Sequence, residues 1–441
     1  MVIIPVSYNE NDRPNVTRLT EDFSKSGYFI NCSGKVFIWI ESMGFWQIIA
    51  HGEAVRSLRK FLGDSDQSRV KDSVLKKIAE YMRNLSQLET VMEPHKTKIN
   101  LLNGVLDIET LQMEEHSREL GFDYCYRFSY QNDLSIYEAK NFLKYVKTSI
   151  GIDPESDKFS YLLQLMGYLL VRNFAGKKAV FFQGPSEIGK SRILHLLENV
   201  FGNFSSVPLS SLGDRFRLSL MNHSYINIVH ENGDGEGMVK HADIFKKIVA
   251  GEAVIIEEKG KSPQQVTLQT KLIYAVNDLP EWPLTIDRSI RNRMAVFVFP
   301  DNLKVIDRDP EIDAKLVLEK NIIFSEVCKA LKTLRDNEFK FPVIKDAEAL
   351  LDTHFSSLNS IEGFCEDCCV FGIDQRVHYK SLYEAYVRHC KKNLYTKVSE
   401  TLLKKYFLAK PGVEPDRFRD HGVNIRGLRG VGLQDMVGGE Y

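Results

Sequence analysis

The segment that most constrains the fold is residues 177–202, where an apolar run, a turn of small residues and an amphipathic run follow one another. Residues 179–182 predict a buried strand, and apolar residues return at helical spacing between Ile193 and Val200. The turn between them fits the pattern G-x-x-x-x-G-K-[ST], in the strand–loop–helix context that this pattern requires. The chain is therefore expected to have an α/β core built around a phosphate-binding loop. The loop and its first helical turn consist of Gly184, Pro185, Ser186, Glu187, Ile188, Gly189, Lys190, Ser191 and Arg192.

The residue types of this loop suit a nucleoside triphosphate. Gly184 and Gly189 let backbone N–H groups turn toward phosphates, and the new helix presents its positive end to them. Lys190 can reach the β- and γ-phosphates, and the hydroxyl of Ser191 can ligate Mg²⁺. The plainer interpretation is a glycine turn in which Lys190 is a solvated charge. The complete pattern with its flanks favours a site for ATP and Mg²⁺, with Ser191 as the metal ligand.

A strand-like run that begins at Tyr225 ends in an acid, Glu231. In a phosphate-loop enzyme, such an acid polarises the attacking water. The alternative is a carboxylate that faces solvent at the end of a strand. Many such strands end in two acids, one of which supports the metal, but here His230 holds the first of these positions. Direct support of a metal by this strand is therefore in question.

A helix at residues 245–249 and two strands at 253–257 and 265–268 follow. The tip between the strands carries Lys259 and Lys261, which makes it a candidate finger onto a nucleic-acid backbone. A tip of this kind standing alone is more often a solvated turn.

The next apolar strand, residues 272–276, ends at Asn277, whose amide can sense a γ-phosphate or orient water. Arg288, Arg291 and Arg293 then precede another apolar strand. Arginine suits reaching the γ-phosphate of a neighbouring subunit because its planar fork stays charged and binds oxygens bidentately. Surface salt bridging is the alternative for each of the three.

In this order, the motifs resemble the superfamily 3 helicases, which are AAA+ ATPases of viruses, phages and mobile elements. The sequence looks most like the phage and plasmid primase–helicase type, which includes the Rep proteins of staphylococcal pathogenicity islands. The segment INLLNGVLDIET at residues 99–110 resembles the stretch that precedes the ATPase in that group. The segment that begins FCEDCCVF resembles the start of its C-terminal region. The resemblance covers the chain from about residue 95 onward.

The resemblance implies a role for each matched residue. Lys190 and Ser191 would hold phosphate and metal, Glu231 would be the catalytic acid, and Asn277 would be the polar sensor. One or more of the three arginines would be a finger that acts in trans, with Arg291 and Arg293 favoured. Such a finger implies a head-to-tail ring, for which the family expectation is a hexamer. Lys259 and Lys261 would track single-stranded DNA in its channel, and a separate primase or host replication proteins are conceivable partners.

The C-terminal part is locally basic within a chain of net charge −1. Residues 376–430 contain 13 Lys and Arg against 5 Asp and Glu, a local net charge of +8. We expect a helix at 380–392, a second helix at 399–409 and a hairpin at 422–431. A winged-helix domain that binds duplex DNA fits this pattern. The resemblance implies that such a domain can recognise repeats at a replication origin. A small basic cap with no DNA role is the alternative. The DNA-contacting candidates are Lys404, Lys405, Arg426 and Arg429.

These segments divide the chain into three expected domains. An α+β N-terminal domain covers residues 1–135, with hairpin strands at 28–49 and helices at 55–85. The AAA+ ATPase domain covers 136–345, and its last stretch, 301–345, is helical. The winged-helix domain covers 346–441. The N-terminal part contains no convincing set of paired carboxylates for a primase.

Seven cysteines are thinly spread, which fits free thiols in a reducing cytoplasm. Cys365, Cys368 and Cys369 raise the possibility of a zinc site, but there is no second C-x-x-C, and core packing is favoured. The most apolar stretch, at residues 161–174, is interrupted by polar residues, which argues against a membrane span.

Taken together, the sequence predicts an ATP-dependent, ring-forming DNA helicase that also initiates replication of a mobile element. Two rival hypotheses remain. One is an origin-binding protein that is switched by ATP and hydrolyses little of it, which His230 supports. The other is an AAA+ remodeller of protein substrates, against which the basic C-terminal part argues.

Overall fold

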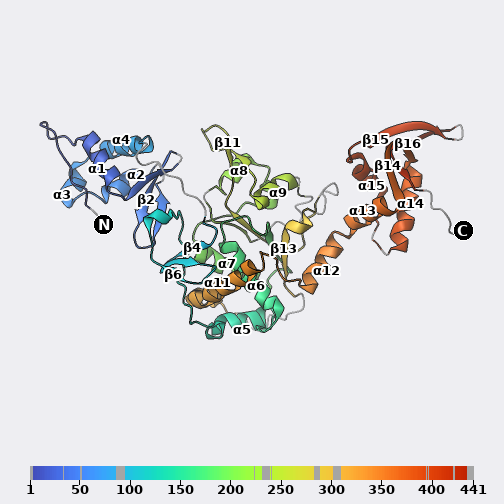
Figure 1. The fold of residues 1–441 in the computed structure, drawn as a ribbon, viewed down its shortest axis with the longest axis horizontal. Coiled ribbons are helices and arrows are strands. Elements are labelled where there is room, and N and C mark those ends of the chain that lie inside the picture. Colours follow the sequence, from blue (N-terminus) through green and yellow to red (C-terminus); the bar gives the residue numbers. More distant parts are fainter. Residues whose placement is uncertain are drawn as a thin grey trace.

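The computed structural model describes residues 3–32, 34–49, 52–85, 95–222, 224–230, 239, 241–282, 289–300, 309–393, 395, 397–420 and 423–434. Figure 1 shows three parts in chain order: an N-terminal part, a larger central part and a C-terminal part that α12 and α13 join to it. Among these residues, no helix combines the length and the apolar character needed to span a bilayer.

The N-terminal part packs helices against a small antiparallel sheet. Trp39 and Trp46 face each other across its strands, with ring centroids 5.3 Å apart, and a core runs from Ile4 to Met82. The strands expected at 28–49 and the helices expected at 55–85 are confirmed. The first helix was not anticipated; Asn15 caps it by accepting a hydrogen bond from the Arg18 N–H at 3.1 Å. The elements are α1 (Val16–Lys25), β1 (Phe29–Cys32), β2 (Lys35–Ile40), β3 (Phe45–Ile48), α2 (Ala54–Arg59), α3 (Asp64–Arg69) and α4 (Asp72–Arg83).

A second small sheet joins this part to the central one. The buried Asn100 donates from Nδ2 to the carbonyls of Met43, Gly44 and Tyr124 at 3.1, 2.9 and 2.8 Å, so one amide ties the two parts together. A single hydrophobic core runs from Ile99 to Leu334, across the domain boundary expected at residue 135. The elements here are β4 (Lys98–Leu101), β5 (Gly104–Asp107), β6 (Met113–Glu114), α5 (Lys140–Ser149) and α6 (Asp157–Leu170).

The centre of the molecule is a five-stranded parallel sheet in the order β13-β7-β12-β9-β8. Alternate strand residues enter two different cores, so both faces are buried, as a parallel sheet requires. Phe182 packs with α6, α7 (Lys190–Phe201) and α11 (Lys320–Asp336). Phe181 packs on the other face with α8 (Arg215–Ser219) and α9 (Ala242–Ala250). The strands are β7 (Ala179–Gln183), β8 (Phe204–Ser205), β9 (Ile226–Val229), β12 (Lys271–Val276) and β13 (Met294–Val298).

The strands and helices expected around the phosphate-binding loop are confirmed. The antiparallel hairpin of β10 (Val254–Ile256) and β11 (Gln264–Val266) is also present, and it projects from the central part near α8 in Figure 1. The helical stretch expected at 301–345 contains α10 (Ile312–Leu318) and α11, and residues 301–308 lie outside the described chain. Short 3-10 helices lie at Arg118–Leu120, Ile136–Glu138, Leu209–Ser211 and Arg291–Arg293.

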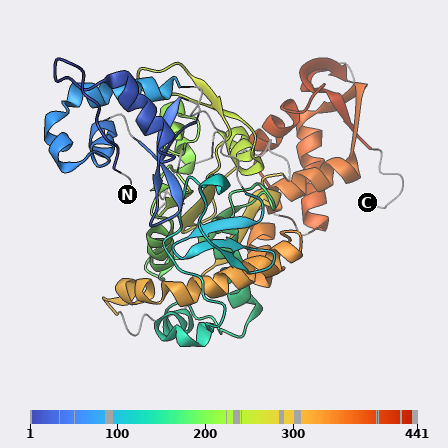
Figure 2. The same ribbon diagram turned by 60° about the vertical axis from the view of Figure 1, so that its left-hand side comes forward.

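The C-terminal part is a helix–strand–helix–helix–hairpin unit, seen from another side in Figure 2. The two helices expected at 380–392 and 399–409 are confirmed, and the Ser399 side chain caps the second by accepting from the Leu402 N–H at 3.3 Å. The elements are α12 (Lys345–His354), α13 (Ser356–Cys368), β14 (Cys369–His378), α14 (Tyr379–Lys392), α15 (Glu400–Leu408), β15 (Glu414–Asp420) and β16 (Val423–Leu433).

The hairpin expected within residues 422–431 is wrong. Residues 423–431 belong to one long strand, β16, which pairs with both β15 and β14. Its glycines suggested a turn, but they allow close approach of neighbouring backbone instead. A Cβ at Gly427 would lie 2.1 Å from the Val377 carbonyl oxygen, and one at Gly430 would lie 2.0 Å from that of Gly412. The true hairpin joins β15 to β16.

All seven cysteines are free thiols, as expected. Cys365, Cys368 and Cys369 are buried in one hydrophobic core with Phe364 and Phe407, which confirms the packing role. A hydrogen bond with Cys365, together with burial, raises the pKa of Cys369 far above its ordinary value, so this thiol stays protonated.

Candidate nucleotide-binding site

The expected phosphate-binding loop follows β7 directly and ends where α7 begins. Gly184 has φ +154, and a Cβ there would lie 2.7 Å from the Cβ of Phe299, so only glycine fits against the chain beyond β13. Gly189 has φ +98 and precedes the first residue of α7. These two glycines let the loop turn sharply between strand and helix. The loop therefore lies at the carboxyl end of a central parallel strand, where open α/β sheets bind ligands.

Lys190 lies folded into the loop rather than extended into solvent. Its Nζ donates to the carbonyl oxygens of Gly184 and Pro185, the latter at 2.9 Å, and to Oδ1 of Asn277 at 3.1 Å. The residue is only 7% exposed. The carbonyl oxygens of Gly184 and Pro185 and the amide oxygen of Asn277 therefore hold the ammonium inside the loop.

Asn277 reaches the loop because β12 pairs in parallel with β7, with Val276 opposite Gln183. Its Nδ2 lies 3.3 Å from Oγ of Ser186, and Nε2 of Gln183 donates to its carbonyl oxygen at 2.7 Å. The structure thus brings together two residues that the sequence separates by 87 positions, Lys190 and Asn277.

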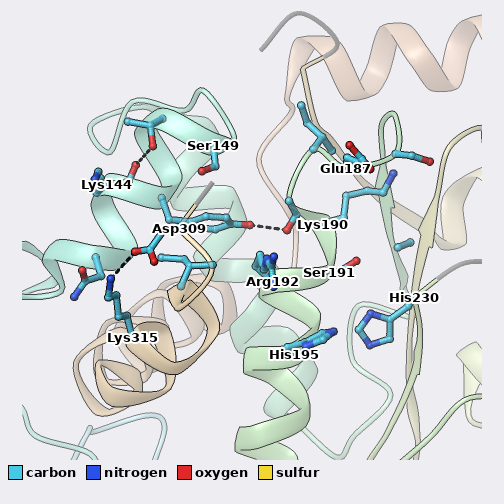
Figure 3. Close-up of a pocket in the computed structure, with 18 of the residues that line it drawn as sticks. Lys144, Ser149, Glu187, Lys190, Ser191, Arg192, His195, His230, Asp309 and Lys315 are labelled. Atoms are coloured by element: carbon cyan, nitrogen blue, oxygen red, sulfur yellow. Dashed lines mark hydrogen bonds and ion pairs between the residues drawn. The ribbon is translucent and has the colours of Figure 1, made fainter. Parts of the chain in front are cut away.

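The loop opens into a cavity of about 700 Å³. Besides the loop, its walls come from α5 and from the segment that leads into α10. Figure 3 shows Lys144 and Ser149 on one wall and His195 and His230 on the other, with Lys190 and Ser191 between them. The cavity is large enough for a drug-sized ligand. The lining residues outside the loop are Asn141, Lys144, Tyr145, Thr148, Ser149, His195, His230, Ala275, Asn277, Asp309, Ile312 and Lys315.

The α5 wall went unrecognised in the sequence. Tyr145 donates from its hydroxyl to the Gly189 carbonyl oxygen at 2.8 Å, which braces the loop from α5. Complete burial raises the pKa of Tyr145 well above its ordinary value, so the hydroxyl remains a neutral donor. Asp309 and Lys315 form an ion pair at 2.6 Å on the same side of the cavity. These residues have no recognisable local motif, so only the packing of α5 and α10 on α7 reveals them.

The polar cluster of His195, Glu198 and His230 lies at the opposite wall. His230 follows the end of β9, and its Nε2 lies 2.7 Å from Oε1 of Glu198 on α7. The His195 ring meets that of His230 edge to face, with centroids 4.8 Å apart. The expected catalytic acid, Glu231, lies outside the described residues, as does Arg288.

Arg291 and Arg293 lie just before β13, which runs parallel to β7. They therefore lie at the amino edge of the sheet, away from the loop of their own chain. Arg291 forms ion pairs with Glu348 at 2.8 Å and Asp352 at 2.7 Å, both on α12. Arg293 donates to the Ser289 carbonyl oxygen at 2.9 Å.

The candidate DNA-contacting residues are distributed over two surfaces. Lys259 and Lys261 are exposed at the hairpin tip, and Lys261 pairs with Glu258. On α15, Lys405 is exposed, whereas the Lys404 ammonium lies 4.0 Å from the centre of the Tyr379 ring.

β16 carries the other two candidates. Arg426 is exposed, and its backbone pairs with that of Arg417 on β15. Arg429 forms an ion pair with Glu414 at 2.9 Å.

Two protein families match parts of the chain. Residues 23–149 match a family described as D5 N terminal like, and residues 182–293 match a family of unknown function, DUF5906. Each match covers less than half of the chain. The second includes all of the loop from Gly184 to Arg192, together with Asn277 and Arg291.

Solved structures of the NrS-1 C-terminal region, in its apo form, also resemble the chain. Two of them align with TM-scores of 0.47 and 0.46 at 13% and 14% sequence identity. The alignments cover 91% and 92% of this chain and 95% and 96% of those chains. These scores describe a weak likeness in fold.

Proposed function

We propose that the chain is an ATP-dependent DNA helicase of the superfamily 3 type, with an AAA+ core, that forms a ring and initiates replication of a mobile genetic element. One observation supports this most: Lys190 is held in a loop between Gly184 and Gly189, beside Asn277, at the mouth of a 700 Å³ cavity. A lysine that opens a helix directly after a glycine-turned loop is the residue that contacts the phosphates in a triphosphate site.

In this proposal, different residues of the site contact the phosphates, the metal ion and the attacking water. The backbone of residues 184–189 and the amino end of α7 cradle the phosphates. Lys190 leaves its carbonyl partners for the β- and γ-phosphate oxygens, and Asn277 moves with it or orients the attacking water. Mg²⁺, which Ser191 would hold, supplies further neutralisation of phosphate charge. Glu231 is the proposed general base that takes a proton from the attacking water.

The proposed ring places the pocket of one subunit against the arginine edge of the next. Arg291 and Arg293 lie at the amino edge of the sheet while the loop lies at the carboxyl edge, so a head-to-tail contact could bring the two edges together. Arg291 would then exchange its α12 carboxylates for a γ-phosphate. This exchange would connect nucleotide binding to the C-terminal part, because Glu348 and Asp352 lie on the helix that leads there.

DNA contacts in this proposal come from two places. The β10–β11 hairpin carries Lys259 and Lys261 and would contact the single strand through its phosphates. The order α13, β14, α14, α15, β15, β16 is that expected of a winged-helix domain, in which α15 enters a major groove and β15–β16 forms the wing. The match to the D5 N terminal like family supports the link to phage primase–helicase proteins.

A second candidate function is an ATP-switched origin-binding protein with little turnover. One observation favours it: His230 stands where many such strands carry an acid, and it is hydrogen-bonded to Glu198. In this alternative, ATP binding rearranges the subunits, but the weaker support for a metal slows hydrolysis.

A strand-displacement assay distinguishes the helicase from the ATP-switched origin-binding protein. We would measure release of a labelled strand from a partial duplex with a 3′ or a 5′ single-stranded tail, in the presence of ATP and Mg²⁺. The helicase proposal predicts displacement that requires ATP, fails with a non-hydrolysable analogue and is lost in Lys190→Ala. Lys147→Ala is the matched control because Lys147 is an exposed lysine on α5 outside the cavity wall. ATP-dependent binding to duplex DNA with no displacement from either tail would favour the switch.

A further inference from the structure

We propose that His195, Glu198 and His230 form a binding site for a transition-metal dication of the Zn²⁺ class, separate from the Mg²⁺ site at Ser191. Among the described residues, these three are the one group of histidine, cysteine and acidic side chains placed to hold a metal ion. The proposal does not depend on hydrolysis of ATP.

The backbone preorganises the three side chains. His195 and Glu198 are three residues apart on α7, so they lie on the same face of the helix. His230 comes from the end of β9, which lies beside β12 in the sheet. Figure 3 shows the His195 side chain on α7 directed toward His230, and the two rings meet edge to face. Two rigid elements therefore supply the ligands, as suits a metal site.

The distances are close to those of a bound ion. One ligand atom from each side chain lies within 4.8 Å of the others, and the closest contact, Nε2 of His230 to Oε1 of Glu198, is 2.7 Å. Ligands at about 2.1 Å from a tetrahedral ion lie roughly 3.4 Å apart. The widest gap therefore closes with a small rotamer change of His195, whose side chain is 48% exposed and free to turn.

The ligand types select the class of metal. Two imidazoles and one carboxylate suit Zn²⁺, Co²⁺ or Mn²⁺ better than Mg²⁺, which prefers an all-oxygen shell. Three protein ligands leave a fourth position open, and His195 and His230 both line the nucleotide cavity. A water molecule or a phosphate oxygen could occupy that position.

A second carboxylate supports His195. Oδ2 of Asp313, on α10, lies 3.9 Å from Nδ1 of His195, and Asp313 also pairs with Arg192. At this distance the carboxylate does not hydrogen-bond to the ring, but a small rotation of His195 would let Nδ1 donate to it, which would orient the ring and raise its basicity toward a metal. The same pairing neutralises the nearby guanidinium of Arg192, which would otherwise repel a cation.

The test is metal binding by the full, untagged chain in the absence of nucleotide. Equilibrium dialysis against Zn²⁺ followed by elemental analysis should give one ion per chain, and Co²⁺ should give the visible absorption of a low-coordinate site with nitrogen ligands. His195→Ala, Glu198→Gln and His230→Ala should each weaken binding by about tenfold or more. His195→Ala alters a half-exposed side chain, so it is the variant least able to disturb folding.

Two control variants complete the experiment. His241→Ala removes an exposed histidine outside the cluster, and Cys365→Ser alters the buried thiol cluster; both should retain the ion. Zn²⁺ should also raise the melting temperature of the wild type but not that of His195→Ala. No bound ion in the wild type would overturn the proposal. So would an ion that survives all three cluster substitutions or disappears in Cys365→Ser.

Discussion

The phosphate-binding loop and the C-terminal basic surface differ in how their charge is held. At the loop, one ammonium is buried at 7% exposure, and oxygens of Gly184, Pro185 and Asn277 surround it. At the C-terminal surface, Lys405, Arg426 and Arg429 are exposed, and Arg429 shares its charge with Glu414. Because the loop depends on one ammonium, a single substitution there should abolish ATP hydrolysis. DNA binding by the C-terminal surface should weaken in small steps with each substitution and should depend strongly on salt concentration.

Substitution of Lys190 should produce the largest effect. Lys190→Ala removes the cation that the loop holds ready, and we expect ATP hydrolysis to fall by about 100-fold or more. The measurement is the steady-state rate of phosphate release at saturating ATP. Lys147→Ala should retain the wild-type rate. Equal rates for both variants would show that the loop is not the hydrolytic site.

Asn277→Ala should produce the next largest effect. Its amide contacts Ser186 and Lys190 but is not the only partner of the ammonium. We therefore expect kcat to fall by roughly 10-fold to 100-fold with a smaller change in KM. A change confined to KM would mean that Asn277 only holds ground-state ATP.

On the C-terminal surface, two adjacent lysines of α15 offer a matched pair. Lys405 is exposed, whereas the Lys404 ammonium is placed over the Tyr379 ring. Lys405→Ala should weaken duplex binding several-fold and lower the slope of log K against log salt by about one, as expected for one lost phosphate contact. Lys404→Ala should weaken duplex binding less than Lys405→Ala does. Binding to duplex DNA is measured by fluorescence anisotropy at several salt concentrations, and an unchanged slope in Lys405→Ala would remove α15 from the DNA interface.

A separate prediction concerns a second buried lysine, at the edge of the sheet opposite the loop. Lys271 donates to the Asn173 carbonyl oxygen at 2.6 Å and lies over the Tyr168 ring, and burial lowers its pKa to about 7. An unfolded lysine keeps its proton up to about pH 10.4. Between these values the unfolded chain binds more protons, so stability should rise with pH, by at most about 1.4 kcal/mol per pH unit.

Lys271→Met should abolish this rise. Urea unfolding midpoints of the whole chain at pH 7 and pH 9 provide the comparison, with Lys147→Met as the exposed-lysine control. If wild type and Lys271→Met change equally between the two pH values, the buried ammonium does not titrate in this range.

The site residues also differ in how far they could be predicted from the sequence. Residues 179–202 form a contiguous strand, loop and helix, so the loop and its lysine were recognisable from local pattern. Asn277 was recognised because it ends an apolar strand. By contrast, Tyr145 contacts the loop only through packing of α5, and no motif marks it.

The C-terminal part was harder to predict. The glycines of β16 are required because they approach the backbone of Val377, on β14, and of Gly412, which precedes β15. Neither neighbour is adjacent in the sequence, so the local pattern cannot distinguish these glycines from turn residues. The pairing of Arg291 with Glu348 and Asp352 likewise depends on where α12 docks. Long-range contacts of this kind are not encoded in a local pattern.

The most direct test of the central claim is the rate of ATP hydrolysis by the full chain with and without single-stranded DNA. We predict a rate that DNA stimulates and that Lys190→Ala abolishes under both conditions. A chain that binds ATP but shows no turnover at any concentration of single-stranded DNA would contradict the helicase account and favour the ATP-switched origin-binding protein.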